Sequence, residues 1–433
     1  MSRSATGTTL TTTLTNARIA APDGMVEGWL RVGAGRVQAL GAGAPGAPEC
    51  AGTGSAGTGS AETESAGTEI LDMGGRHVLP GTVDIHVHGG AGAAFTDADP
   101  ERARRIVDFN RVSGVTTVIG GLVTATPEDL VAQVSALADL CDDGDLGGIY
   151  LEGPYIARSK CGAHDPALLR DPDLAEFERL VKAGRGHLRM ITVAPELPGG
   201  QDLIRAAVAQ GVVAAIGHTE ATYAQTLAAF DAGATVATHI YNQMRPLHHR
   251  EPGPIAAALT DERITVELIN DGVHVHPGAA RLVFDAAGAD RVALVTDAMS
   301  ATGLGDGDYT LGNLDVTVTA GQALLTGTDT IASSTIVLPD AVRRAVRPPK
   351  EVPAQDGTQD GTQYGTPGAL QDPGGVGVGL AAASRAASAT PARALGLDDV
   401  GMIAPGYRAD LLVLDADLET AAVMHRGEWV RAL

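Results

Sequence analysis

The sequence predicts an α/β protein: a (β/α)8 barrel with a small β-sandwich domain built from both ends of the chain. Short runs rich in Val, Ile and Thr alternate with segments of helical length through the middle of the 433 residues, and this pattern is typical of a parallel sheet. Both ends of the chain alternate apolar and polar residues instead, as half-buried strands do. Ionisable residues also collect where the central runs end, as in the active sites of barrels.

Eight runs are interpreted as the strands of the barrel. In chain order they are VDIHVHG, VTTVIGGL, GGIYLEGP, LRMITVAPE, VVAAIGHT, TVATHIYN, ITVELIND and VALVTDA. Each run except the last is followed closely by a candidate helix, such as residues 100–114 or 126–140. Eight such units close into a barrel whose active site lies at the C-terminal ends of the strands. We therefore expect ionisable residues at those ends and nowhere else along the strands.

The change of pattern sets the domain boundaries. We expect residues 1–79 and 399–433 to form the small β domain and residues 80–398 to form the barrel. Residues 42–69 repeat Ala-Gly-Thr-Gly-Ser, and residues 348–379 are rich in Gly, Pro and Gln. Neither stretch can bury enough apolar surface to offset its ordering entropy, so both are expected to be surface loops.

Composition and charge exclude several classes of protein. The net charge of −21 argues against nucleic acid or an anionic membrane as a partner. No 18 apolar residues run uninterrupted, and the N-terminal segment lacks the apolar stretch of a signal peptide. Cys50, Cys141 and Cys161 are too few and too scattered for a disulfide framework or a thiolate metal site. We expect a soluble, cytoplasmic protein.

His86 and His88 stand one residue apart at the end of the first run. On a strand, residues two apart share a face, so both imidazoles can point into the barrel mouth. A His-x-His pair alone is more often structural than metal-binding. Further candidate ligands end other runs at equivalent heights, namely Glu152, His218, His239 and Asp297. Imidazole and carboxylate ligands without thiolate suit Zn, Fe, Co, Mn or Ni.

Such a metal predicts hydrolytic chemistry. A catalytic metal lowers the pKa of bound water towards ~7 and polarises a carbonyl, and a neighbouring carboxylate can pass the proton of the water to a leaving nitrogen. Asp297 is placed for this role; a helix cap is the less favoured interpretation, because the following MSATGLGDGDY is not helical. Many two-metal barrels bridge their metals with a carboxylated lysine. None of Lys160, Lys182 and Lys350 ends a strand, so Glu152 must supply that carboxylate.

Eight short motifs then occur in a specific order: PGTVDIHVHG, LEGPYI, KCGAHD, IGHTEA, THIYNQM, REPG, NDGVHV and VTDA. Together they resemble the N-acetylglucosamine-6-phosphate deacetylases of the amidohydrolase superfamily. The most specific part is LEGP with GAHD twelve residues beyond its Glu, followed by GHT and TH. The resemblance runs from about Asn16 to the C-terminus. It implies a metal-dependent barrel in which metal-bound hydroxide hydrolyses N-acetylglucosamine 6-phosphate to glucosamine 6-phosphate and acetate.

The resemblance also implies catalytic and metal-binding roles. The principal divalent metal, one per subunit, would be held by Glu152, His218 and His239. His86 and His88 would offer a second position, which some members of the family lack. Asp297 would act as general base and then acid. His164 would hydrogen-bond the acetyl carbonyl oxygen and stabilise the oxyanion.

Substrate contacts are implied in the same way. The residues assigned to substrate binding are Ala163 through its backbone, Asn242, Gln243, Arg250, Asp271, His274, Ile331, Ala332 and Ser333. Arg250 and His274 would bind the phosphate, with one of them reaching across the interface of a homodimer. Ile331, Ala332 and Ser333 belong to a segment, IASS, that would close over the substrate.

The phosphate assignment also has support from the residues themselves. RPLHHREPG places Arg245, His248, His249 and Arg250 in one short loop of an otherwise acidic chain. Arg offers planar, charge-assisted donors that match phosphate. The alternative is a solvated basic loop. Arg250 is favoured as the ligand contact over the other three residues.

Two departures from the family leave the substrate open. Gln243 replaces the small residue that usually follows the Asn, and SSTIVL replaces the usual run with Leu-Thr-Met. One alternative is therefore another amidohydrolase: a deacetylase of a different N-acyl hexosamine phosphate, a cyclic-amide hydrolase or a deaminase. The other alternative is a barrel that binds a sugar phosphate without catalysis.

Overall fold

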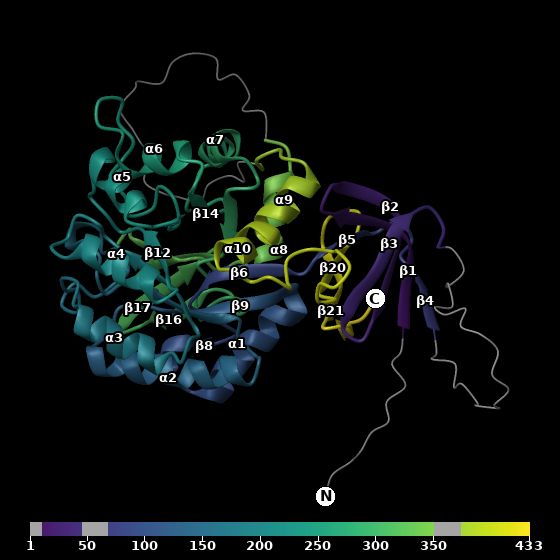
Figure 1. Ribbon diagram of the computed structural model, residues 1–433, viewed down its shortest axis with the longest axis horizontal. Helices are drawn as coiled ribbons and strands as arrows, with labels where there is room; N and C mark the ends of the chain where they lie inside the picture. The colour runs from purple at the N-terminus through teal and green to yellow at the C-terminus, as the bar shows by residue number, and fades with distance from the viewer. Residues whose placement is uncertain (1–10, 46–67, 350–373) are drawn as a thin grey trace, which may run out of the picture. The chain divides into compact units, whose positions relative to one another are not determined.

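The computed structural model describes residues 11–45, 68–349 and 374–433 (Figure 1). The chain divides into two compact units. One unit is Thr82–Gly401, and the other combines the residues up to Gly81 with Met402–Leu433.

These unit boundaries lie two or three residues from the predicted ones at 79 and 399. The two low-complexity stretches fall largely on residues 46–67 and 350–373, which lie outside the described residues. The prediction that they are surface loops therefore stays a prediction.

The larger unit is built around a ring of eight parallel strands. They are β6 (Thr82–Val87), β9 (Val115–Leu122), β10 (Gly148–Glu152), β11 (Leu188–Val193), β12 (Val213–Ile216), β13 (Val236–Ala237), β14 (Thr265–Ile269) and β15 (Val292–Val295), and they pair in this order. The ring closes where the chain leaves β15, because the Asp297 N–H donates to the His86 carbonyl at 2.8 Å and the His88 N–H donates to the Ala298 carbonyl at 2.8 Å. Seven of these strands fall within a predicted run and β6 begins one residue before its run, so the predicted barrel is confirmed.

Helices follow the strands and cover the outside of the ring (Figure 1). They are α1 (Pro100–Ser113), α2 (Pro127–Asp142), α3 (Leu174–Ala183), α4 (Gly200–Ala209), α5 (Tyr223–Asp231), α6 (Gly253–Thr260), α7 (Pro277–Ala287) and α8 (Leu338–Val346). Asp99, Thr126, Asp173 and Thr222 begin four of them by accepting hydrogen bonds from first-turn N–H groups. In the part of the chain that the structure describes, no helix is long and apolar enough to cross a membrane.

Two further helices, α9 (Leu380–Ala387) and α10 (Ala389–Ala394), follow α8 in the described chain. Ala392 of α10 belongs to the same buried apolar cluster as Val83 and Ala293. Val83 and Ala293 lie near the starts of β6 and β15. Helix α10 therefore covers the end of the barrel where the strands begin. The candidate active site lies at the other end, where the strands finish.

A small antiparallel sheet is inserted between β15 and α8. Its strands are β16 (Gly307–Leu311), β17 (Leu314–Thr319), β18 (Gln322–Leu325) and β19 (Ile331–Ser333), paired in chain order. Met299 and Ala301, which follow β15, pack with Val316 and Val318 in one buried cluster. This sheet holds the segment IASS against the end of β15.

The smaller unit is one continuous eight-stranded sheet with strands from both ends of the chain. Its strands are β1 (Thr11–Ala21), β2 (Gly24–Gly33), β3 (Arg36–Ala42), β4 (Thr68–Asp72), β5 (His77–Pro80), β20 (Leu411–Leu414), β21 (Thr420–His425) and β22 (Glu428–Arg431). The two ends join where β5 pairs antiparallel with β20. Leu14, Ile19, Leu30, Leu411 and Met424 belong to its buried core. The predicted β domain from both termini is confirmed.

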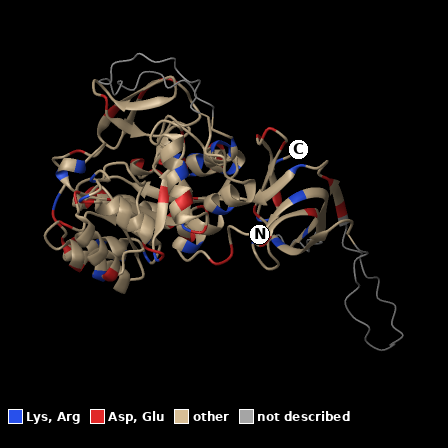
Figure 2. Cartoon of the chain, turned by 90° about the horizontal axis from the view of Figure 1, so that it is seen from above, with Lys and Arg blue, Asp and Glu red and all other residues tan. Residues whose placement is uncertain are grey.

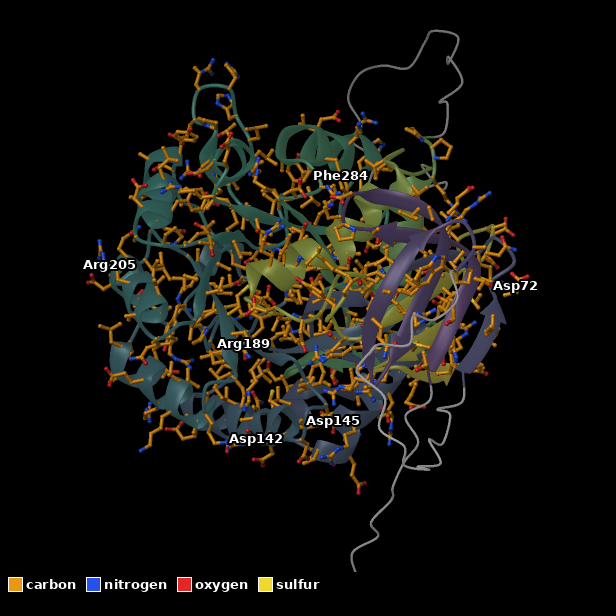
Figure 3. The ribbon with its side chains drawn as sticks, turned by 45° about the vertical axis from the view of Figure 1, so that its right-hand side comes forward. Asp72, Asp142, Asp145, Arg189, Arg205 and Phe284 are labelled. Carbon is orange, nitrogen blue, oxygen red and sulfur yellow. The ribbon has the colours of Figure 1, made fainter. Side chains whose placement is uncertain are left out.

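Positions of basic and acidic residues are interspersed along the outer helices (Figure 2). Asp142 at the end of α2 accepts from Arg185 at 2.8 Å and from His187 at 2.7 Å, and nearby Asp145 accepts from Arg104 at 2.8 Å (Figure 3). Because these pairs are exposed and screened by water, each contributes little to the free energy of unfolding.

Candidate active site

The carboxylate of Glu152, at the end of β10, lies between two pairs of histidines. Its Oε1 is 3.0 Å from His218 Nε2 and 2.9 Å from His239 Nε2. Its Oε2 is 3.0 Å from His88 Nε2 and 3.5 Å from His86 Nε2. Each oxygen therefore serves a different pair, and all five side chains are buried.

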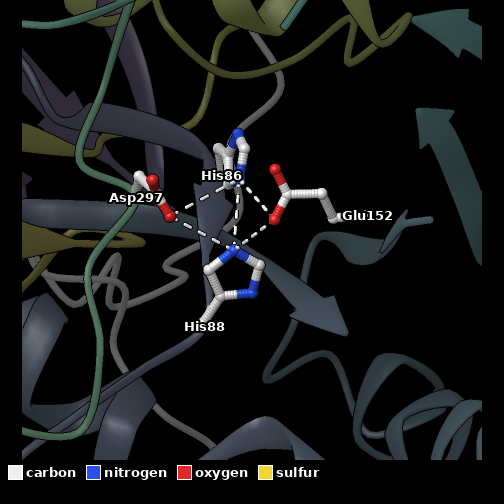
Figure 4. A group of neighbouring side chains, drawn as sticks. All are labelled: His86, His88, Glu152 and Asp297. Atoms are coloured by element: carbon white, nitrogen blue, oxygen red, sulfur yellow. Dashed lines mark hydrogen bonds and ion pairs between the residues drawn. The ribbon is translucent and has the colours of Figure 1, made fainter. Parts of the chain in front are cut away.

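Asp297, just after β15, completes the group around His86 and His88 (Figure 4). Its Oδ1 lies 3.2 Å from His88 Nε2 and 3.7 Å from His86 Nε2. The two Nε2 atoms are 3.2 Å apart. Four side chains thus direct their nitrogen or oxygen atoms towards a common point.

The outer nitrogens of two rings show which atoms are free to bind a cation. His218 Nδ1 lies 2.6 Å from the Lys160 carbonyl, which can only accept, so Nδ1 carries the hydrogen and Nε2 keeps its lone pair. His86 Nδ1 lies 3.0 Å from a carboxylate oxygen of Glu267, with the same result. The Nε2 atoms of His218 and His239 are 3.1 Å apart and both face Glu152.

These separations fit a metal ion. A tetrahedral Zn²⁺ with ligands at about 2.0–2.1 Å holds its ligand atoms roughly 3.3 Å apart. The donor atoms are imidazole nitrogens and carboxylate oxygens, which suit Zn and several neighbouring metals. Both groups therefore have the chemistry of a divalent metal site, and Glu152 belongs to each of them.

The electrostatic field of the site favours positive charge. Burial opposes protonation of His86 and His88, but the surrounding carboxylates overcome it and raise the pKa of His88 to about 9 and that of His86 well above its usual range. Burial also opposes ionisation of Glu152 and Asp297, yet the neighbouring histidines keep the pKa of both carboxyls low. A cation is stabilised here by the same carboxylates.

The backbone turns sharply where several site residues leave their strands. His218, His239 and Asp297 have φ values of 47°, 23° and 51°, in the left-handed region that residues other than glycine rarely adopt. This conformation costs of order 1–3 kcal/mol and is found mainly at functional sites. Gly121 makes room for one ring, because a Cβ there would lie 3.0 Å from His88 Nδ1.

His164 presents an N–H to the cavity. The Thr124 backbone N–H donates to His164 Nδ1 at 3.3 Å, and Thr124 Oγ1 lies 2.8 Å from the same nitrogen. Because a backbone N–H can only donate, Nδ1 is the acceptor and Nε2 carries the hydrogen. Burial lowers the pKa of His164, so the ring is a neutral hydrogen-bond donor.

His274 carries a positive charge more readily than His164. Its Nδ1 lies 2.7 Å from Asp271 Oδ2, and Asp271 also accepts from the backbone N–H groups of Val273 and His274. Burial alone would lower the pKa of His274, but the attraction of the Asp271 carboxylate raises it. Asp271 thus holds the His274 ring in place and favours its protonated form.

A cavity of about 250 Å³ contains most of these groups. Of the residues assigned from sequence, those that line it are His88, Glu152, Ala163, His164, His218, His239, Asn242, Gln243, His274, Asp297, Ile331 and Ala332. His86, Asp271 and Ser333 lie behind this lining and contact residues in it. Arg250 is the one assigned residue that the structure leaves apart.

Arg250 lies on the exposed loop before α6. Its guanidinium contacts the neighbouring His249 ring at 2.8 Å, and the rings of His249 and His248 lie tilted against each other with centroids 4.3 Å apart. Arg245, in the same loop, donates to the Glu220 carbonyl at 2.8 Å. The phosphate contact of Arg250 therefore stays a prediction.

The segment IASS is fastened to the end of β15. Ser333 Oγ donates to the Asp297 carbonyl, and the Ser334 N–H donates to the same carbonyl at 2.8 Å. Ile331 and Ala332 line the cavity with Asp329 and Thr330 of the preceding turn. The two serines thus fix the backbone of Asp297 and the wall of the cavity together.

Three residues that support the site were missed from the sequence. Thr124 and the Lys160 carbonyl follow no catalytic pattern, so no signal pointed to them. Glu267 does carry a signal in the sequence, because it is a charged residue inside the apolar run ITVELIND. The prediction that ionisable residues lie only at strand ends is wrong, since Glu267 and Asp84 are buried within β14 and β6. They are tolerated there because each accepts hydrogen bonds.

Residues 77–430 match the model of the amidohydrolase family. The chain is similar to N-acetyl-D-glucosamine-6-phosphate deacetylase of Mycobacterium smegmatis, solved as an Asp-to-Ala mutant in complex with N-acetyl-D-glucosamine 6-phosphate, at 43% identity with a TM-score of 0.83, over 98% of this chain and 100% of that one. It is 37% identical to N-acetylgalactosamine-6-phosphate deacetylase of Escherichia coli O157:H7, over 81% of this chain and 87% of that protein. It is 34% identical to human N-acetylglucosamine-6-phosphate deacetylase, over 84% of this chain and 85% of the human one.

Proposed function

The chain belongs to the amidohydrolase family, and we propose that it hydrolyses N-acetylglucosamine 6-phosphate to glucosamine 6-phosphate and acetate. The observation that carries the proposal is the composition of one cavity: Glu152 between two histidine pairs, with His164, Asp297 and an Asp271-paired His274 beside it. The M. smegmatis relative, whose structure holds N-acetyl-D-glucosamine 6-phosphate, supports the substrate class.

In this proposal the principal divalent metal is held by Glu152, His218 and His239, and His86 and His88 offer a second position. When bound, the metal supplies a water of lowered pKa and polarises the acetyl carbonyl. Glu152 contributes one oxygen to each position, which is the bridging role that the lysines of this chain do not fill.

In this proposal Asp297 moves the proton, and His164 stabilises the negative charge that develops on the substrate. Asp297, ionised and facing His88 at 3.2 Å, takes the proton of the attacking water and then delivers it to the departing nitrogen. The Nε2–H group of His164 donates a hydrogen bond to the acetyl carbonyl oxygen, where negative charge develops. Because the ring is neutral and held by Thr124, this donor needs no reorganisation during the reaction.

The cationic end of the cavity is proposed to bind the phosphate. His274 lines the cavity, and the carboxylate of its neighbour Asp271 raises its pKa and so favours a positive charge there. Ala163, Asn242 and Gln243 line the same cavity and contact the sugar in this proposal.

A homodimer is part of this proposal. Arg250 lies on an exposed loop and is not among the residues that line the cavity of its own subunit in the described structure. We expect it to bind the phosphate of the neighbouring subunit. Mixing Arg250→Ala with Asp297→Asn subunits tests this, because a hybrid dimer would rebuild one intact site and recover activity. A monomer in sedimentation analysis, or mixtures without recovery, would count against the shared site.

The decisive experiment combines metal analysis of the purified protein with acetate release from N-acetylglucosamine 6-phosphate. We expect at least one divalent metal per chain and hydrolysis that chelation abolishes and metal restores. The unphosphorylated sugar should react with a kcat/KM lower by about 10–150-fold, because a hydrogen bond to a charged group contributes ~1.5–3 kcal/mol. Equal kcat/KM values for the two sugars would eliminate the phosphate role.

N-acetylgalactosamine 6-phosphate is the second candidate substrate. It is favoured by the 37% identity to the E. coli galactosamine enzyme over most of both chains. Gln243 is the residue expected to influence the choice between the two sugars, because its side chain lines the cavity. It packs on Gly162, where a Cβ would lie 2.9 Å from Gln243 Cγ. The ratio of kcat/KM for the two epimers decides between the substrates.

A further inference from the structure

We propose that Glu267 is a positioning residue for the second metal position, where its carboxylate holds His86 with Nε2 turned towards the cation. The inference rests on the proposed function, because it assumes that the protein binds divalent metal at the end of the barrel. It goes further by assigning a determinant of metal number to a residue that lies one layer deeper than the cavity lining.

The geometry of Glu267 is specific. Its side chain is fully buried in the middle of β14. One oxygen, Oε2, lies 3.0 Å from His86 Nδ1 and 3.1 Å from the backbone nitrogen of His239, which donates to it. The same oxygen therefore contacts a side chain of one ligand group and the backbone of the other.

Among the described residues, only His86 offers a positive charge to the carboxylate of Glu267. Its second oxygen, Oε1, is buried and has no hydrogen-bond partner among the described residues. Its one ion-pair partner there is His86. A buried carboxylate is costly unless a positive charge compensates it, and here that charge is available only through the His86 ring and the ion which the ring faces.

The contact also distinguishes His86 from His88. His88 Nδ1 has no partner in the described structure, whereas His86 Nδ1 faces a carboxylate. The other side of the His86 ring is held by Tyr150, whose ring lies edge-on with centroids 4.6 Å apart. A carboxylate behind a metal-binding imidazole fixes its tautomer and strengthens it as a ligand, and losing such a partner typically weakens metal binding by about 10–100-fold.

The principal position should depend on Glu267 much less. Glu267 contacts that group only through the backbone N–H of His239, which an amide oxygen can accept equally well. The substitution Glu267→Gln keeps the size and one acceptor oxygen, removes the charge and replaces the second oxygen by an amide NH2. It should therefore weaken the second position while leaving the principal one and the fold intact.

The experiment measures metal bound per chain by equilibrium dialysis against buffered free Zn²⁺, followed by elemental analysis. We expect two binding steps for the unmodified protein. In Glu267→Gln we expect the tighter step to be unchanged and the Kd of the weaker step to rise by about 10–100-fold. Glu196→Gln is the matched control, because Glu196 also ends a barrel run and accepts from the Glu220 N–H at 2.6 Å without lining the cavity.

Three results would overturn the inference. One is a second Zn²⁺ bound by Glu267→Gln with the affinity of the unmodified protein. Another is saturation of the unmodified protein at one ion per chain, which leaves the proposed function standing if acetate is still released. The third is an equal loss of both steps with a lowered melting temperature of the metal-free protein, which would make Glu267 a structural residue only.

Discussion

Replacing His164 tests whether a neutral imidazole stabilises the reacting carbonyl. In His164→Asn, the shorter side chain can still place a polar atom near Thr124, where Nδ1 of the imidazole lies 2.8 Å from Thr124 Oγ1. It cannot reach the position of Nε2, which in the native ring is 3.5 Å from Glu152 Oε2. The variant therefore keeps the packing of the loop and loses the donor to the substrate.

The expected loss follows from the role of the donor. Removing one preorganised oxyanion donor typically costs about 2.7–4 kcal/mol, or roughly 10²–10³ in kcat. His164 is absent from both groups that could hold a metal ion, so the metal content per chain should not change. His164→Gln is the matched variant, because its amide nitrogen reaches about as far as Nε2 and should recover part of the lost rate.

The assay measures initial rates of acetate release together with the metal content of each variant. A kcat within threefold of the unmodified enzyme in His164→Asn, with metal content unchanged, would refute the oxyanion role. Thr124→Val extends the same test. It removes the Oγ1 contact and leaves the backbone N–H at 3.3 Å, so a loss of ~1 kcal/mol, about fivefold in kcat, is expected.

Three further predictions test other parts of the chain. Asp297→Asn should lower kcat by about 10²–10⁴-fold while metal analysis shows an unchanged principal site. The Asp271 carboxylate raises the pKa of His274, so the phosphate contact should be complete below that pKa and be lost as pH rises through it. In Asp271→Asn the increase of KM with pH should therefore begin at lower pH. An unchanged profile of KM against pH would contradict this. Asp410→Ala leaves the largely buried Arg408, now 2.5 Å from that carboxylate, without its partner, and should lower the free energy of unfolding by about 3–5 kcal/mol in a denaturant titration.

The barrel was predictable because its signals are local and repeated. A buried parallel strand needs a short run of apolar residues, and the connection to the next strand needs a helix, so each unit is marked in the sequence. The clustering of the candidate ligand residues could be predicted for the same reason. Once His86, Glu152 and His218 are placed at the ends of strands, the closure of the barrel brings them together without further information.

The position of Arg250 could not be predicted in the same way. A basic loop beyond the sixth strand is visible in the sequence, but its direction depends on turns that no periodic pattern specifies. In the structure Arg250 contacts His249 and lies apart from the cavity lining.

The support of the site could not be predicted because it depends on backbone conformation and on depth in the barrel. His218, His239 and Asp297 follow ordinary strand residues, yet each takes a left-handed φ that turns its side chain towards the site. Hydrogen bonds compensate the strain: the Asp297 carbonyl, for example, accepts from Ser333 and from the Ser334 N–H. The serines of IASS therefore fix the backbone of Asp297 and, through it, the position of its carboxylate at the edge of the cavity.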